Sequence, residues 1–275
     1  MYALKSAQRL SRGVRVEWED GVCANFTYVW LRDNGNRRPS LVHLDLDATP
    51  RNVDHNENNL NLIWPPFLSS CYSSKFLRDH TSVKAPPVQK NLIPKRVLPK
   101  PWRFQDTPEK PDNSHMATVS WGELATELGT VWPHFQRVPS IIGVEARTPN
   151  AKVHLVDAVT CLEIMSHTNP EEFGFLVNTP LEYQQGFFNS SHNVAQVYDG
   201  QVMTSVFNNA LRTAEITTAS LDMLYRSMKA LSRICYQNLT TEVLQPGELL
   251  VVDNGQTYLG APAQMGRQLS LKLYN

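Results

Sequence analysis

The sequence predicts an α+β protein in three parts: a small β-rich domain over residues 1–84, a linker over 85–113, and a mixed domain over 114–275. Three observations support this division. Near the N-terminus, apolar and polar residues alternate, as in half-buried strands. Residues 86–111 hold 7 of the 18 prolines, and such a stretch cannot sustain a helix or an inner strand. Beyond it, helical and strand patterns are mixed.

The bulk composition excludes several classes of protein. Lys plus Arg (26) equals Asp plus Glu (26), so no global charge points to nucleic acid or to an anionic membrane. No apolar run reaches about 18 residues, so no membrane span is expected. The four cysteines lie far apart, which favours free thiols in a reducing compartment. We expect a cytoplasmic protein, and Lys5, Arg9 and Arg12 leave a mitochondrial presequence as the alternative.

The N-terminal part carries two hairpin patterns. Val14, Val16 and Trp18 alternate with polar residues, a turn follows at 19–21, and the alternation resumes over 26–30. The second pattern predicts a strand around 44–46, a polar turn at 54–59 and a strand over 60–64.

The predicted strand at 44–46 contains an H-x-D triplet, His43-Leu44-Asp45. Non-haem iron oxygenases hold Fe(II) with two His and one carboxylate. On a strand, His43 and Asp45 face one side, which suits a metal site but equally an exposed polar face opposite Leu44 and Leu46. Short motifs often match by chance, so we interpret the triplet as an exposed face.

The C-terminal part combines helices with strands. The predicted elements are, in order, a helix over 155–165, a helix start at 169–172, a strand over 194–198, a turn at 199–200, a strand over 202–207, a helix over 220–238, and a turn at 245–247 before a strand over 249–252.

Several of these segments carry a family resemblance. The run Trp30-Leu31-Arg32-Asp33-Asn34, after Val16-Glu17-Trp18-Glu19-Asp20-Gly21, resembles the N-terminal domain of the γ-butyrobetaine and trimethyllysine dioxygenases, the Fe(II)- and 2-oxoglutarate-dependent hydroxylases of carnitine biosynthesis. The C-terminal motifs that agree in order are Val156-Asp157, Asn169-Pro170-Glu171-Glu172-Phe173, Phe207-Asn208-Asn209, Gln245-Pro246-Gly247-Glu248, Val252-Asp253-Asn254 and Gly266-Arg267-Gln268-Leu269. The resemblance lapses only over about 130–152. It implies an incomplete double-stranded β-helix, a taurine-dioxygenase-like jelly roll with flanking helices.

The resemblance also implies a structural zinc, held by cysteines after the Asp-Asn pair and by a later His. After Asn34 this chain has no cysteine until Cys71, and one cysteine cannot fill four positions around zinc. We therefore expect no structural zinc.

The iron and 2-oxoglutarate implied by the family can be compared with the sequence in the same way. The family's H-x-D strand falls before His154, but residues 116–153 contain a single His, His134, which is followed by Phe135-Gln136. The second iron His falls shortly after Asp253-Asn254, where this chain has Leu259. The expected metal ligands and catalytic residues are therefore not found.

The co-substrate side of the family site is retained. Arg267 matches the arginine that pairs with the distal carboxylate of 2-oxoglutarate, and Asn208 and Asn209 match a segment that lines the same pocket. The alternatives are a surface salt bridge for Arg267 and a turn-forming role for the two asparagines. Most of the family's aromatic cage for a trimethylammonium group belongs to the missing interval, and its tyrosine six residues beyond the arginine is Leu273 here.

Three hypotheses follow from the sequence. The chain is a degenerate family member that binds a partner or a small molecule, either 2-oxoglutarate or a trimethylammonium compound. Alternatively, it is a working oxygenase with unexpected ligands, such as His134, His154 or His192. The third hypothesis is an incomplete gene model that lacks the H-x-D strand, but one missing exon does not explain Leu259 or the missing cysteines. Nothing in the sequence fixes the oligomeric state, so a homodimer is left open.

Overall fold

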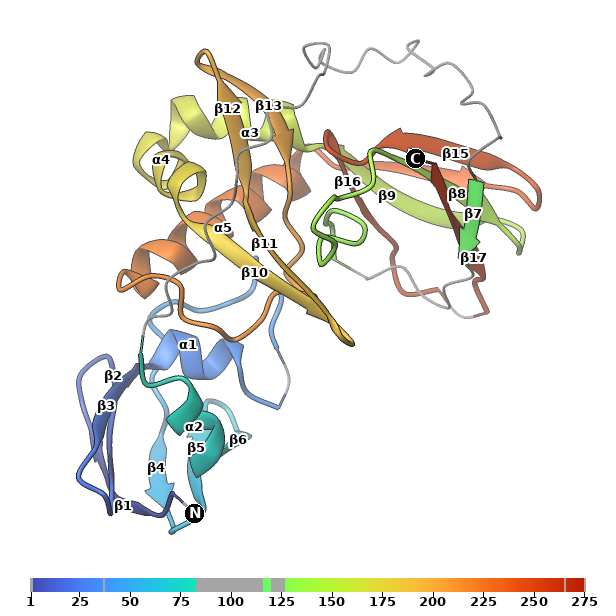
Figure 1. Ribbon diagram of the computed structural model, residues 1–275. Helices are drawn as coiled ribbons and strands as arrows, with labels where there is room; N and C mark the ends of the chain where they lie inside the picture. The colour runs from blue at the N-terminus through green and yellow to red at the C-terminus, as the bar shows by residue number, and fades with distance from the viewer. Residues whose placement is uncertain (1, 37, 83–115, 120–126, 265, 275) are drawn as a thin grey trace. The chain divides into compact units, whose positions relative to one another are not determined.

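The computed structural model describes residues 2–36, 38–82, 116–119, 127–264 and 266–274 (Figure 1). These residues form two compact units. The N-terminal unit takes its residues from 1–85 and 214–229, and the jelly-roll unit takes its residues from 86–213 and 230–275. The residues 214–229 are not part of the N-terminal domain that the sequence pattern delimits at 84. The predicted linker over 85–113 lies outside the described residues.

The N-terminal unit contains two antiparallel three-stranded sheets and two short helices. In the first sheet the order is β1-β2-β3, and in the second it is β4-β5-β6. The elements are β1 (Leu4–Arg9), β2 (Gly13–Trp18), β3 (Cys23–Thr27), α1 (Tyr28–Asp33), β4 (Asn52–His55), β5 (Asn59–Trp64), β6 (Leu68–Ser73) and α2 (Ser74–Asp79).

Both predicted hairpins exist, but their bounds differ from the prediction. The alternation over 26–30 does not continue as a strand, because the Thr27 side chain accepts a hydrogen bond from the Trp30 main-chain N–H at 3.4 Å and caps helix α1. Tyr28 and Trp30 are therefore helical residues. The second hairpin joins β4 to β5 and does not include residues 44–46.

The strand predicted around His43 is absent from this part of the chain. Residues 41–43 form a turn, in which the His43 N–H donates to the Ser40 carbonyl at 3.0 Å. Leu44 is buried, while His43 and Asp45 are exposed. The prediction failed because one buried leucine between polar residues gives the same apolar–polar alternation as a short half-buried strand.

The jelly-roll unit is built from two antiparallel sheets and two hairpins. In the larger sheet the order is β15-β8-β17-β7, and in the smaller sheet it is β14-β9-β16. The strands are β7 (Met116–Val119), β8 (Ile141–Ala146), β9 (Ala151–Asp157), β10 (Pro180–Gln185), β11 (Phe188–Asn193), β12 (Ala195–Tyr198), β13 (Gln201–Ser205), β14 (Thr240–Leu244), β15 (Leu249–Asp253), β16 (Thr257–Gly260) and β17 (Leu269–Tyr274).

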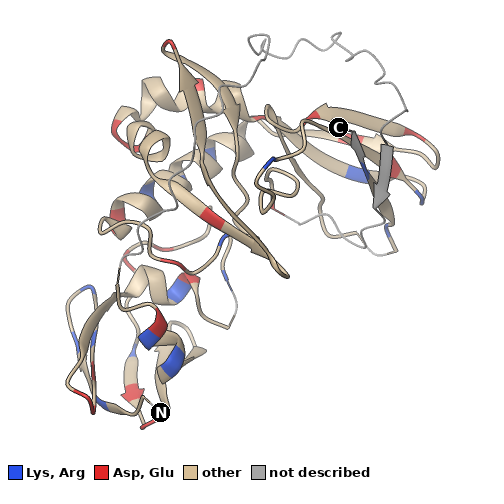
Figure 2. Cartoon of the chain, viewed as in Figure 1, with Lys and Arg blue, Asp and Glu red and all other residues tan. Residues whose placement is uncertain are grey.

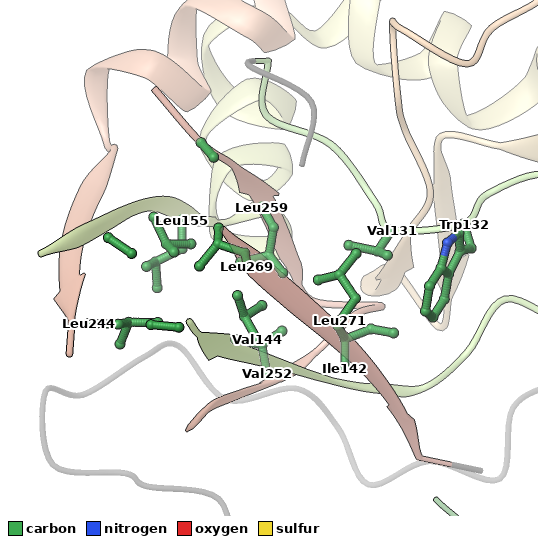
Figure 3. Packing of buried hydrophobic residues seen from close by; sticks show 14 residues of the cluster. Val131, Trp132, Ile142, Val144, Leu155, Leu244, Val252, Leu259, Leu269 and Leu271 are labelled. Atoms are coloured by element: carbon green, nitrogen blue, oxygen red, sulfur yellow. The ribbon is translucent and has the colours of Figure 1, made fainter. Parts of the chain in front are cut away.

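One hydrophobic core lies between the two sheets of this unit (Figure 3). The larger sheet contributes Val144, Val252 and Leu271, and the smaller sheet contributes Leu155 and Leu259, all buried. A jelly roll has eight strands in two sheets. The described residues supply four strands to one sheet and three to the other, so the predicted class, α+β with an incomplete double-stranded β-helix, is confirmed.

Helices α3 (Ala158–Thr168) and α4 (Pro170–Asn178) pack against strands of this unit, and the predicted helix α5 (Leu221–Gln237) has residues 221–229 in the N-terminal unit and residues 230–237 in the jelly-roll unit. Helix α3 begins three residues later than its apolar pattern indicates, because β9 continues to Asp157, whose carboxylate caps the helix through the Thr160 N–H at 3.0 Å. None of the helices in the described residues is long and apolar enough to cross a membrane.

Candidate functional site

The residue that the resemblance places at the second iron ligand lies in the core. Leu259 lies on β16, where it pairs with Leu155 of β9, and its side chain is 2% exposed within the core (Figure 3). An aliphatic side chain offers no lone pair to a metal. The position that the resemblance assigns to an imidazole therefore contributes to packing between the sheets.

The other edge of β16 is covered by a very short bridge. The main chain of Gly129 exchanges two hydrogen bonds of 2.9 Å with Leu259, and the Thr130 N–H donates to the Phe207 carbonyl at 2.7 Å. A Cβ atom at Gly129 would lie 2.9 Å from the Phe207 oxygen and 3.0 Å from the Asn208 Cα. Only glycine allows this close approach. Among the described residues, the isolated bridge at Gly129 therefore stands where a fourth strand would complete the smaller sheet.

Asn254 holds the chain that follows this bridge. Its side-chain amide donates to the carbonyls of Val131 (2.9 Å) and Pro139 (3.0 Å), and its oxygen accepts from the Val131 N–H at 2.9 Å. Asn254 is fully buried. The Asp-Asn motif therefore has a structural role here, because it anchors the loop that begins at Val131.

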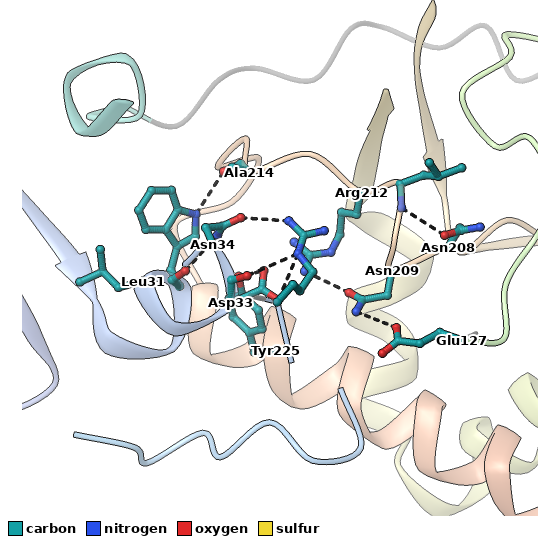
Figure 4. A network of polar contacts seen from close by, with 12 residues as sticks. Leu31, Asp33, Asn34, Glu127, Asn208, Asn209, Arg212, Ala214 and Tyr225 are labelled. Atoms are coloured by element: carbon teal, nitrogen blue, oxygen red, sulfur yellow. Dashed lines mark hydrogen bonds and ion pairs between the residues drawn. The ribbon is translucent and has the colours of Figure 1, made fainter. Parts of the chain in front are cut away.

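Asn208 and Asn209 are buried and engaged with nearby polar groups. Asn208 donates to the Thr130 carbonyl at 3.0 Å and accepts from the Leu211 N–H at 3.1 Å. Asn209 donates to Glu127 Oε2 at 3.0 Å and accepts from Arg212 at 3.2 Å (Figure 4). Both amides are therefore engaged by neighbouring protein groups, and the Asn208 oxygen is bound by the main chain three residues further on.

Arg267 lies on the loop between β16 and β17 and is half-buried. Its guanidinium donates to the Pro262 carbonyl. Burial lowers the pKa of His154, and the positive charges of Arg267 and then Lys152 lower it further. The His154 ring also contacts the Thr241 hydroxyl at 2.9 Å. Cationic groups therefore gather at this end of the smaller sheet, which favours an anionic ligand.

The three histidines named as alternative metal ligands fall into two places. His154 lies on β9, whereas His134 and His192 both contact Phe135. The centroids of the His134 and Phe135 rings are 4.6 Å apart, and His192 Nε2 lies 3.0 Å from the Phe135 carbonyl oxygen. Burial lowers the pKa of both imidazoles. Among the described residues, no group of three or more His, Cys, Asp or Glu side chains is placed to hold a metal ion. The described residues therefore do not fit the iron that the resemblance implies.

In the N-terminal unit, the Trp-Leu-Arg-Asp-Asn motif has structural contacts. Asp33 is fully buried and accepts a hydrogen bond from the Tyr225 hydroxyl at 2.8 Å (Figure 4). Trp30 Nε1 donates to the Ala214 carbonyl at 3.1 Å. The motif thus joins helix α1 to the segment 214–229 of the same unit.

The chain after Asn34 packs directly against strand β6. A Cβ atom at Gly35 would lie 2.7 Å from the Ser70 hydroxyl and 3.1 Å from the Tyr72 hydroxyl. Ser70 accepts a hydrogen bond from Trp64 Nε1 at 3.1 Å, and Tyr72 donates to the Leu31 carbonyl. Burial raises the pKa of Tyr72 to about 12. Protein groups therefore fill the space that follows the motif.

Several of these residues were not indicated by the sequence pattern. Gly129, Thr130 and Arg212 lie outside every quoted motif, although Arg212 follows Asn209 by three residues and is buried. The hairpin β10–β11 was also missed, because β10 has only two alternating apolar residues after its proline and β11 is polar beyond Phe188.

No protein-family model matches this chain, and no curated protein matches it. Among solved structures, the chain is similar to a taurine dioxygenase from Burkholderia xenovorans (12% identity, 58% of this chain, 62% of that chain, TM-score 0.45). It is also similar to an asparagine oxygenase in complex with Fe(II), 2S,3S-3-hydroxyasparagine and succinate (14% identity, 55% and 50% of the two chains, TM-score 0.45).

A further similar structure is the non-haem iron oxygenase OrfP in complex with Fe, succinate and (3S)-hydroxy-L-Arg (11% identity, 58% and 56% of the two chains, TM-score 0.45). In each case the matched part spans less than two thirds of the other chain. The iron, succinate and amino acids belong to those proteins.

Proposed function

We propose that this chain is a ligand-binding relative of the γ-butyrobetaine and trimethyllysine hydroxylases, which binds 2-oxoglutarate through Arg267 and does not oxidise a substrate. The observation that carries the proposal is the contrast between Leu259 and Arg267. The position that the resemblance assigns to a metal ligand holds a buried aliphatic side chain, while the arginine that the resemblance assigns to the co-substrate is present and half-buried.

The iron side of the proposal rests on the ligands. Fe(II) in this class of enzyme needs two imidazoles and a carboxylate around one point, with positions left open. Leu259 cannot supply one of them, and His134 and His192 lie together without a described carboxylate beside them. We infer that the family's oxidation step has been lost with its metal ligands.

The 2-oxoglutarate side rests on charge and geometry. A guanidinium binds a carboxylate with two parallel hydrogen bonds, which a single carbonyl such as that of Pro262 cannot reproduce. A dicarboxylate that reaches Arg267 would offer it a charged, bidentate acceptor. Lys152 adds to the positive potential there. Asn208 and Asn209 are assigned to this site by the resemblance alone, and their amides bind Thr130 and Glu127.

Isothermal titration of the metal-free chain with 2-oxoglutarate tests the proposal. Arg267→Ala should weaken binding about 10- to 150-fold, which corresponds to the roughly 1.5–3 kcal/mol of a charge-assisted hydrogen bond. Arg267→Lys should recover only part of the loss, because an ammonium lacks the planar fork. The matched control is Arg137→Ala, an exposed arginine of the same unit.

A parallel titration with γ-butyrobetaine tests the other ligand class of the family. Binding of γ-butyrobetaine without 2-oxoglutarate would redirect the proposal to a trimethylammonium compound. If the unmodified chain takes up neither ligand, or if Arg267→Ala binds 2-oxoglutarate as tightly as the unmodified chain, the proposed function is wrong.

A further inference from the structure

Lys152 and His154 face the same side of strand β9, because they are two residues apart. His154 pairs with Thr241 of β14 and with Gly260 of β16, and its ring lies 2.9 Å from the Thr241 hydroxyl. In Figure 2 the blue segment of β9 is Lys152, the only Lys or Arg of that strand. Leu155, on the opposite side of β9, lies in the core, so Lys152 and His154 lie on the outer face of the smaller sheet.

The three strands of the smaller sheet place no carboxylate on this outer face. Besides Lys152 and His154, their residues on that side are Val156, Thr241, Val243, Tyr258 and Gly260. Glu127, whose main chain lies next to Gly260, bonds Asn209 through its carboxylate at 3.0 Å. Lys152 is exposed, and the described residues give it no ion pair. Its ammonium can therefore meet an anion from solution.

The loop that carries Arg267 is held against the start of β9. Gln264 accepts a hydrogen bond from the Lys152 N–H at 3.2 Å and donates to the Asn150 carbonyl at 3.0 Å. The Arg267 N–H in turn donates to the Gln264 carbonyl at 3.4 Å. Burial lowers the pKa of His154, and the charges of Arg267 and then Lys152 lower it further, so both cations act on the same place.

The two cations differ from a metal ion in what they recognise. A metal ion can bind the carboxylate and the oxo group of a 2-oxo acid together, as a chelate. The described residues do not fit such an ion, and the ammonium of Lys152 is a point charge that attracts a carboxylate and needs no oxo group beside it. The charge of a second carboxylate, rather than the oxo group, should therefore decide the affinity at this place.

We propose that Lys152 is the specificity-determining residue of the Arg267 site, and that this site takes five-carbon dicarboxylates as a class, with or without a 2-oxo group. The inference rests on the proposed function, because Arg267 binds one carboxylate in both. The planar guanidinium holds that carboxylate with two hydrogen bonds, while Lys152 attracts the other. A monocarboxylate of the same length leaves Lys152 without an anion and should bind more weakly.

Calorimetric titration of the chelator-treated full chain at low salt tests the inference with three five-carbon probes: 2-oxoglutarate, glutarate and pentanoate. The Kd values of glutarate and 2-oxoglutarate should agree within about fivefold. Pentanoate should bind about fivefold more weakly than glutarate, or worse, which is the upper range for an exposed ion pair. Arg267→Ala should weaken the binding of all three.

Variants at Lys152 separate its charge from its bulk. Lys152→Met keeps an unbranched side chain without the charge, so the preference for glutarate over pentanoate should disappear, with an unchanged melting temperature because Lys152 is exposed. Lys152→Arg keeps the charge and should keep the preference. The matched control is Lys75→Met, an exposed lysine of the N-terminal unit, which should leave all three Kd values unchanged.

The outcomes distinguish this inference from the proposed function. If 2-oxoglutarate binds through Arg267 but more than about fivefold tighter than glutarate, the oxo group is recognised and the inference alone is wrong. An unchanged ratio of the glutarate and pentanoate Kd values in Lys152→Met would also overturn it, because the second anchor would lie elsewhere. If neither dicarboxylate binds, or if Arg267→Ala has no effect, the proposed function fails and the inference fails with it.

Discussion

The main chains of Gly129 and Leu259 exchange two hydrogen bonds of 2.9 Å at the edge of the smaller sheet. This pair closes β16 with one bridging residue, and it directs the Leu259 side chain into the core that the two sheets share. The same pair marks the place where the family resemblance requires a metal ligand. In this chain the residue at that place serves packing between the sheets.

A histidine at position 259 should damage the fold. Leu259→His should lower the free energy of unfolding by about 3–5 kcal/mol, because it removes buried apolar contacts and buries an imidazole without a designed partner. Leu259→Met, which conserves volume, should cost less than about 1.5 kcal/mol. Urea unfolding measures both. Should Fe(II) restore the stability of Leu259→His, the metal site is nearer to completion than proposed.

The close approach at Gly129 predicts a second stability effect. Gly129→Ala should destabilise the chain by about 1–3 kcal/mol, because the new methyl group meets the Phe207 carbonyl oxygen at 2.9 Å. Gly174, within helix α4, is the matched control, since nothing lies within 4 Å of its added Cβ. Gly174→Ala should stabilise by about 0.5–1 kcal/mol. Equal effects at the two positions would contradict the tight bridge.

The N-terminal unit should hold its structure without zinc. Elemental analysis of the purified chain should find no stoichiometric zinc, and a chelator should leave the melting temperature unchanged. Ser70→Ala should cost about 1–3 kcal/mol, because it leaves the buried Trp64 Nε1 without its acceptor. Ser69→Ala, on the neighbouring exposed position of β6, should be nearly neutral. One tightly bound zinc per chain would refute the expectation.

Acid should destabilise the jelly-roll unit through its buried histidines. Burial lowers the pKa of His192 below its ordinary value of 6.5, so the unfolded chain takes up a proton before the folded chain does. The contribution of His192 to the free energy of unfolding is therefore complete above pH 6.5, and it is lost as the pH falls from 6.5 through the lowered pKa of the folded chain. Chemical unfolding at a series of pH values should show this slope in the unmodified chain.

The control for the pH effect uses a pair of histidines. His192→Gln should reduce the acid-dependent slope, whereas His43→Gln should not, since His43 is exposed. An identical slope in both variants would assign the acid effect to other groups.

Local chemistry made much of the fold predictable from the sequence. The turn at Asp199-Gly200, the proline at the start of α4 and the apolar stripe of α5 each depend on neighbouring residues, and each predicted element exists. The strand at residues 44–46 failed because one buried leucine imitates alternation. Tyr28 and Trp30 failed as strand residues because capping by Thr27 outweighs their β propensity.

The candidate site was less predictable, since its contacts join distant parts of the chain. Gly129 meets Leu259, and Asn254 binds the main chain of Val131, across intervals that no local pattern encodes. The matches of Arg267, Asn208 and Asn209 came from family motifs, which indicate position but not partners. Their contacts with Pro262, Thr130 and Glu127 required the three-dimensional structure.

The most direct test of the account is the succinate released from 2-oxoglutarate by the purified chain, with Fe(II), ascorbate, oxygen and either γ-butyrobetaine or trimethyllysine. Because Leu259 cannot bind iron, we predict no succinate above that of a chelator-treated sample. Stoichiometric or greater release that depends on substrate and is abolished by a chelator would contradict the account. It would mean that the metal is held by His134, His192 or residues outside the described ranges.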